Sequence, residues 1–187
     1  MDSQMRHQNQ ISYQLRRSAL MIGLTVAGAL LGAFSLTPAR PALLWNFTAS
    51  VPIGLYRIGD TPPQPGDLVA LDPTGAAKSA LMSFGVLAKD RLLLKPIVAH
   101  AGDTVCRHSL TVTVNGFLAA KARPRTREGR LLPEWGGCWR LASSEIFLLA
   151  PHPDSFDSRY FGPVGLQDVI GVAHPLLTFL PSSGEAA

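Results

Sequence analysis

An uncharged apolar run near the N-terminus constrains the fold more than any other feature of the sequence. Residues 18–36 read SALMIGLTVAGALLGAFSL, nineteen residues without a charged side chain. A helix of this length rises about 28 Å, enough to cross the hydrocarbon core of a bilayer. A cleaved signal peptide is the alternative, but its apolar region is usually only about 7–15 residues long. We therefore predict a single transmembrane anchor over residues 18–36.

Positive charges predict how this anchor is oriented. Arg16 and Arg17 directly precede the run, and the positive-inside rule then keeps residues 1–17 in the cytoplasm. Residues 37–187 would form one exported domain, on the periplasmic side of a bacterial inner membrane. The net charge of +4 comes from local clusters, and no nucleic-acid recognition module is visible. We expect inner-membrane lipid to be a partner and nucleic acid not to be one.

The two cysteines agree with an exported domain. Cys106 and Cys138 are the only cysteines in the chain, and a lone pair in an oxidising compartment usually forms a disulfide. No CxxC motif or histidine pair with metal-ligand spacing accompanies them. We predict a Cys106–Cys138 disulfide, and we expect no metal and no cofactor.

Beyond the anchor, the pattern predicts a mainly β domain. Short stretches with β-branched or alternating apolar residues are separated by Pro and Gly. Asn115-Gly116, flanked by such stretches, is a strong signal for a β-hairpin. Pro96 predicts a sheet edge or a bulge, and residues 75–89 are compatible with a helix or a loop. The predicted strands include GLYRI, DLVALD, RLLLKPIVAH, TVCRHSLTVTV, EIFLLAP and VIGVAHPLLTFL.

Four segments carry residue types that can act in catalysis. In chain order they contain Ser50-Val51-Pro52, then Pro65-Gly66-Asp67, then Lys95 through Gly102-Asp103, and finally Ser155-Phe156-Asp157-Ser158-Arg159-Tyr160-Phe161-Gly162. Their order and content resemble the membrane-bound serine/lysine signal peptidases of type I. The segments SVPIGLYR and DSRYFGPV and the cysteine pair are most similar to the TraF-type conjugative transfer peptidases within that family.

The resemblance implies a signal-peptidase-like, all-β catalytic domain on one transmembrane helix. It implies that Ser50 is the nucleophile and Lys95 the general base. It further implies that Ser155 orients the lysine amine, that Asp157 and Arg159 form a bracing ion pair, and that Thr48 contributes an oxyanion donor. Pro96 stands where the family has an arginine, and this proline could shift the strand that aims Lys95.

The chemistry of a serine/lysine pair requires these residue types independently of the resemblance. A serine hydroxyl needs a base, and a lysine can serve only if burial lowers its pKa. Lys95 lies inside the apolar stretch LLLKPIV. The alternatives are an edge-strand lysine that extends its amine into water, or a histidine base. The available histidines are His100, His108, His152 and His174.

These observations predict a membrane-anchored serine endopeptidase that cleaves, and in some relatives cyclises, a membrane-embedded pilin precursor. One alternative is a general type I signal peptidase acting on secreted preproteins. Another is a non-catalytic envelope scaffold. The basic run Lys121 to Arg130 is left open between a solvated loop and a contact with acidic lipid or substrate.

Overall fold

The computed structural model describes residues 21–23, 25, 41–86 and 91–179. Residues 21–23 and 25 are helical. In these ranges, no helix is both long and apolar enough to cross a membrane. Nearly all of the anchor predicted over residues 18–36, and all of the cytoplasmic segment 1–17, lie outside the described residues. Residues from Pro41 onward form one compact unit.

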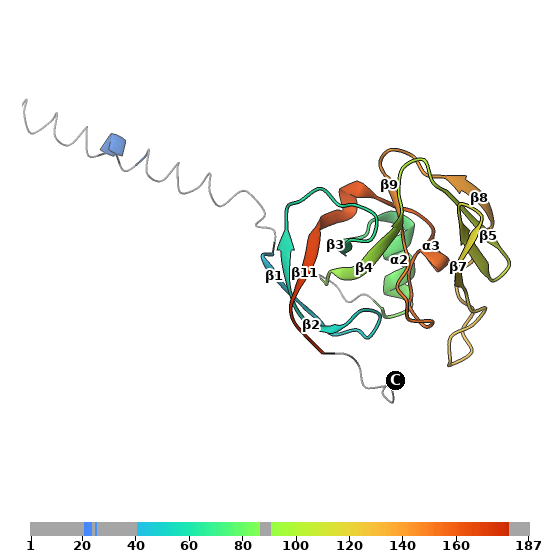
Figure 1. Cartoon of the computed structure of the whole chain (residues 1–187). Coiled ribbons are helices and arrows are strands. Elements are labelled where there is room, and N and C mark those ends of the chain that lie inside the picture. The colour runs from blue at the N-terminus through green and yellow to red at the C-terminus, as the bar shows by residue number, and fades with distance from the viewer. Residues whose placement is uncertain (1–20, 24, 26–40, 87–90, 180–187) are drawn as a thin grey trace, which may run out of the picture. The chain divides into compact units, whose positions relative to one another are not determined.

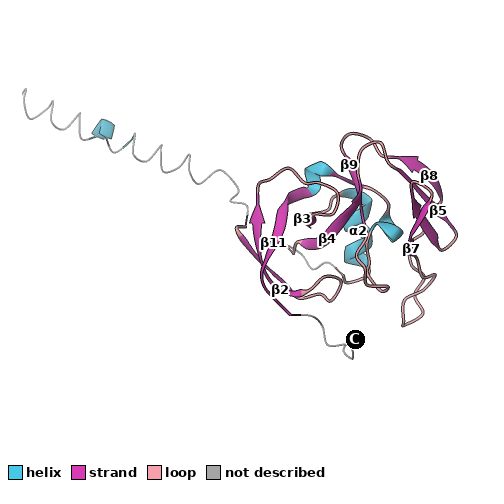
Figure 2. Cartoon of the chain, in the orientation of Figure 1, coloured by secondary structure: helices cyan, strands magenta, loops and turns pink. Residues whose placement is uncertain are grey.

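Strands dominate this unit, as the sequence predicts (Figures 1 and 2). The strand pairs of the described residues are antiparallel. The strands are β1 (Leu43–Asn46), β2 (Ile53–Gly59), β3 (Leu68–Leu71), β4 (Leu93–Ala99), β5 (Thr104–His108), β6 (Thr111–Val114), β7 (Phe117–Lys121), β8 (Gly137–Arg140), β9 (Glu145–Leu148), β10 (Val164–Gly165) and β11 (Val169–Phe179).

The strands form two sheets. The larger sheet has seven strands in the order β1-β2-β11-β3-β4-β9-β10, and the smaller has four in the order β7-β6-β5-β8. The last strand, β11, therefore lies between β2 and β3. Because β4 is paired on both sides, Pro96 does not mark an edge; the pairing of β4 with β9 instead shifts register between Ile97 and Ala99.

Two short helices qualify the all-β prediction. The helix α2 (Gly75–Ser83) resolves the helix-or-loop alternative for residues 75–89, of which 87–89 lie outside the described residues. Its Ala77 and Leu81 pack into the core of the larger sheet. The helix α3 (Ser158–Phe161) falls on the fourth sequence motif, where no helix was predicted. A 3-10 turn, η1 (Leu166–Asp168), precedes β11.

The hairpin predicted at Asn115-Gly116 is confirmed. Both residues have positive φ, 50° and 83°, as a type I′ turn requires, and they join β6 to β7. The C-terminal part of β11 differs from the prediction of a core strand. Gly171–Ala173 are buried, but residues 174–179 are exposed.

Glycine is required where β2 passes β11. Gly54 has a φ of +146°, and a Cβ there would lie 2.7 Å from the Cα of Thr178 and would collide with the carbonyl oxygen of Leu177. These are backbone atoms, so a side chain could be accommodated only by separating the two strands.

We predict that Gly54→Ala lowers the free energy of unfolding by roughly 1–3 kcal/mol through overpacking. Urea titration of the detergent-solubilised protein measures this loss. Gly66→Ala is the matched control, because Gly66 also has positive φ but has nothing within 4 Å of its added Cβ. Equal losses in the two variants would contradict the overpacking explanation.

The disulfide joins two strands of the smaller sheet. Cys106 on β5 and Cys138 on β8 are register partners and are covalently bonded, 32 residues apart in sequence.

We predict that Cys106→Ser/Cys138→Ser lowers the free energy of unfolding by roughly 3–4 kcal/mol in the chain-entropy model. Chemical denaturation with and without reductant measures it. Free thiols found by labelling unreduced, denatured protein would argue against the bond.

Candidate active site

Lys95 lies in the middle of β4, where the apolar stretch buries its whole side chain. It is in register with Val69 of β3, and only 2% of its surface is exposed. Its Nζ donates a hydrogen bond to the Oγ of Ser155 at 2.8 Å. The amine does not extend into water, so the surface-lysine alternative is wrong. Despite Pro96, the side chain reaches the fourth motif.

Burial changes the proton affinity of this amine. Desolvation lowers the pKa of Lys95 from 10.5 to about 8, partly opposed by the negative charge of Asp157 and aided by the positive charge of Arg159. At pH 7, about one amine in ten is then neutral, against about one in three thousand at the ordinary value. A neutral amine is therefore available as a base near neutral pH.

Ser50 lies on a short loop between β1 and β2 that is held by the side chain of Asn46. The Nδ2 of this buried asparagine donates to the carbonyl oxygens of Thr48, Val51 and Pro52 at 2.8, 3.2 and 3.0 Å. Its Oδ1 accepts from the backbone N–H of Thr48 at 3.1 Å. Sequence reasoning missed Asn46. A polar residue that ends the apolar strand LLWN is the signal that could have indicated it.

Thr48 links the side chain of Asn46 to Ser50. Its Oγ1 donates to the Oδ1 of Asn46 at 2.9 Å and lies 3.3 Å from the Oγ of Ser50. The two hydroxyls are thus neighbours on one loop. Because the one Thr48 proton is donated to Asn46, the Thr48 oxygen is placed to accept from the Ser50 hydroxyl.

The fourth motif is fixed from within by a buried ion pair. Arg159 binds Asp157 with two hydrogen bonds, Nε to Oδ1 at 2.7 Å and Nη2 to Oδ2 at 3.0 Å, and the two side chains are 3% and 0% exposed. Both residues also bind the Ala150 backbone, since Asp157 accepts from its N–H and Arg159 donates to its carbonyl. A bidentate pair with satisfied backbone partners is rigid, and it holds Ser155, two residues upstream.

A second buried arginine ties the smaller sheet to this motif. Arg107 of β5 is 2% exposed, and its Nη1 donates to the carbonyl oxygen of Arg159 at 2.8 Å. The sequence motifs do not include Arg107, because its role depends on a partner 52 residues away.

These elements meet at one cleft of about 600 Å³. Four of the residues predicted from the sequence line it together, whereas Asp157 and Arg159 are not among the lining residues. The four are Thr48, Ser50, Lys95 and Ser155. Apolar side chains from the Ser50 loop, the segment after α2 and β4 also line the cleft, as do residues 123 and 125–128 of the basic run.

Of the four histidines weighed as bases, His152 lines the cleft. Its Nδ1 accepts a hydrogen bond from the backbone N–H of Asp154 at 3.2 Å. His100 pairs with Asp103, with 2.8 Å between Nδ1 and Oδ2, and His174 is an exposed residue of β11.

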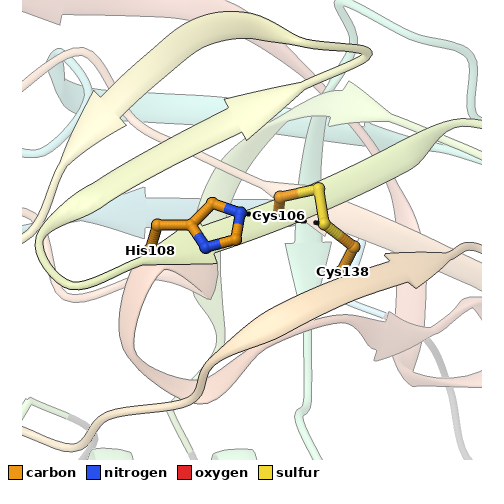
Figure 3. Close-up of side chains that lie close together, drawn as sticks. All are labelled: Cys106, His108 and Cys138. Carbon is orange, nitrogen blue, oxygen red and sulfur yellow. Dashed lines mark hydrogen bonds between the residues drawn. A yellow bond between two sulfur atoms is a disulfide. The ribbon is translucent and has the colours of Figure 1, made fainter.

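His108 lies beside the disulfide, which brings three potential metal ligands close together (Figure 3). The ligating atoms of Cys106, His108 and Cys138 lie within 4.8 Å of one another, and the Nε2 of His108 is 4.0 Å from the Sγ of Cys138. Thiolates, not disulfide sulfurs, bind metals. The bonded cysteines therefore do not make a metal centre with His108.

Comparison with known proteins agrees with this geometry. A family model described as signal peptidase, peptidase S26, matches residues 15–177. A probable conjugal transfer protein TraF of Sinorhizobium fredii is 34% identical over 73% of this chain and 77% of its own length. A plasmid transfer protein TraF of Escherichia coli is 32% identical over 89% of this chain and 98% of its own length.

A solved signal peptidase I from Enterococcus faecalis V583 is a more remote likeness, with a TM-score of 0.36 and 20% identity over 61% of this chain and 98% of that one. The family match and the two relatives are sufficient: the chain belongs to the peptidase S26 family of signal peptidases, within its TraF group of conjugal transfer proteins.

Proposed function

We propose that this chain is a membrane-anchored serine endopeptidase that cleaves a membrane-embedded pilin precursor during conjugative transfer. The observation that carries the proposal is the buried Lys95 amine, bonded to Ser155 and lining the same cleft as Ser50. The names of the relatives support the link to conjugation.

The chemistry begins with Ser50 as the nucleophile. Its Oγ attacks the scissile carbonyl carbon while neutral Lys95 takes the hydroxyl proton. Lys95 then gives this proton to the leaving amine as the C–N bond breaks, which leaves the peptide acylated on Ser50. Water, or the amino terminus of the same peptide, attacks the ester and releases a linear or a cyclic product. The proposed oxyanion donors are the backbone N–H of Ser50 and the Thr48 hydroxyl, which has to rotate away from Asn46 to donate.

The fourth motif positions the amine of Lys95. The Ser155 hydroxyl accepts from the lysine amine and fixes its direction, and the Asp157–Arg159 pair keeps the backbone around Ser155 in place. The amine has to stay in one place because general-base catalysis depends on hydrogen-bond distance to the hydroxyl that loses its proton.

An apolar face supports lipid as a partner and a periplasmic domain at the inner membrane. Leu43, Trp45 and Phe47 project from β1 and the residue after it, and they are 55, 41 and 63% exposed. Leu177 and Phe179 of β11, which lies on the other side of β2, are 54% exposed each. Aromatic and aliphatic side chains gathered on one face are typical of a surface that contacts lipid. Leu43 follows the predicted anchor by only seven residues.

Two other functions remain to be distinguished, a general signal peptidase and a non-catalytic scaffold. Co-expression with a candidate pilin and with a secreted preprotein, followed by mass spectrometry of both, separates them. Processing of the pilin alone supports the proposal. Processing of the preprotein favours a general peptidase, and an intact pair of substrates favours a scaffold.

We predict that Ser50→Ala reduces precursor processing to below about one thousandth of the wild-type rate, because the attacking atom is lost. The inserted, folded protein is recovered in normal amount. Ser143→Ala, an exposed loop serine, is the control and processes normally. Wild-type processing by the Ser50 variant would refute the nucleophile assignment.

We predict that the wild-type rate rises with pH and levels off above about 8, the pKa of Lys95, because the base acts only when neutral. Lys95→Arg is inactive, since a guanidinium stays protonated at any usable pH. Lys95→His retains a trace of activity. Rates measured from pH 6 to pH 10 test this.

His152→Gln is the control for the competing base, because His152 lines the same cleft. We expect it to keep both the rate and the pH profile of the wild type. An active Lys95→Arg variant, together with a flattened pH profile in His152→Gln, would assign the base to the histidine instead.

A further inference from the structure

The basic run has no part in the chemistry proposed above, yet it is an ordered wall of the cleft. We call residues 123–130 the basic loop. Its first residue, Arg123, donates its backbone N–H to the hydroxyl of Tyr160 at 3.0 Å. Arg130 packs over the ring of Phe84, 4.3 Å from its centroid. Across the loop, Arg125 forms a β-bridge with Leu131. Most residues of the loop are exposed, as a solvated loop would be, but these contacts fix its path.

Two arginines of the basic loop are held by a single carboxylate next to the proposed active site. Arg123 and Arg127 each place Nη2 2.7 Å from a different oxygen of Asp154. Asp154 directly precedes Ser155, the partner of Lys95. The two arginines therefore fix the loop against the fourth motif, and one negative charge is shared between them.

Arg125 differs from these two neighbours. Its Nη1 donates to the carbonyl oxygen of Gly129 at 2.8 Å, and in the described part of the chain no carboxylate forms a salt bridge with it. A guanidinium offers five donors in a fixed fork that fits a carboxylate, so most of this fork stays available. Apart from Lys95, the charged lining of the cleft consists of three arginines and two carboxylates, an excess of one positive charge.

We propose that Arg125 is a specificity-determining residue that binds an acidic side chain of the substrate peptide. The inference rests on the proposed function and deepens it by one feature of the substrate. Arg125 lines the same cleft as Ser50 and Lys95, so a peptide whose scissile bond lies at Ser50 passes within the cleft that holds the guanidinium. This shared cleft favours a peptide carboxylate over an acidic lipid headgroup.

The test is cleavage profiling of the full-length protein in detergent micelles against a pool of synthetic peptides with Asp, Asn or Lys at each varied position. Mass spectrometry of the products gives the preference at every position around the cut. We expect the wild type to favour Asp over Asn by about tenfold at one position, as a charge-assisted hydrogen bond allows. Arg125→Gln should lose this preference, so that its rates on the Asp and Asn peptides become equal.

Two further variants keep the test decisive. Arg125→Glu should reverse the preference at that position from Asp to Lys, a gain that a misfolded protein cannot give. Lys121→Gln is the charge-matched control, because Lys121 belongs to the same run but does not line the cleft; it should leave the preference unchanged.

Each remaining outcome counts against the proposal in a different way. An Asp preference that survives in Arg125→Gln, or a wild type without one, overturns the role of Arg125 but leaves the peptidase intact. Weaker binding of Arg125→Gln to phosphatidylglycerol vesicles, with unchanged peptide preference, assigns the arginine to lipid. A wild type that cleaves no peptide, or a Ser50→Ala variant that cleaves as well as wild type, overturns the proposed function itself.

Discussion

Burying the amine of Lys95 imposes the constraint on which the rest of the site depends. A charged amine removed from water is costly unless it loses its proton or gains partners. Here β3 and β9 flank its strand and exclude water, while Ser155 supplies one hydrogen bond. Because Ser155 must be held where the amine ends, the segment that carries it needs its own internal brace, which the Asp157–Arg159 pair provides.

The two halves of the cleft are stabilised by different physical means. The lysine half relies on burial and on an ion pair within the fold, which are insensitive to salt. The serine half relies on Asn46, one neutral side chain that satisfies three carbonyl oxygens and one N–H of a loop without regular structure. A buried side chain with all of these partners rigidifies the loop.

Features set by neighbouring residues could be predicted from the sequence, and features set by distant ones could not. The Asn115-Gly116 turn and the alternating strands depend on local patterns, and the apolar flanks of Lys95 indicated its burial. The role of Asn46 depends on the path of the loop that it holds. The place of Arg125 in the cleft depends on a loop pinned by Tyr160 and Phe84, far away in the chain. The helix α3 is too short for a periodic signal.

The order of the strands in the larger sheet makes the cleft depend on the C-terminal strand, β11. Since β11 lies between β2 and β3, the hairpin that carries the Ser50 loop joins the strands that carry Lys95 only through residues 169–179. A chain emerging from the N-terminus first can pair β1 with β2, and β3 with β4, long before β11 arrives. Until residues 169–179 insert, no strand pairing of the larger sheet links the Ser50 hairpin to β3 and β4. A chain that ends before β11 therefore lacks the strand that places the two halves of the cleft in one sheet.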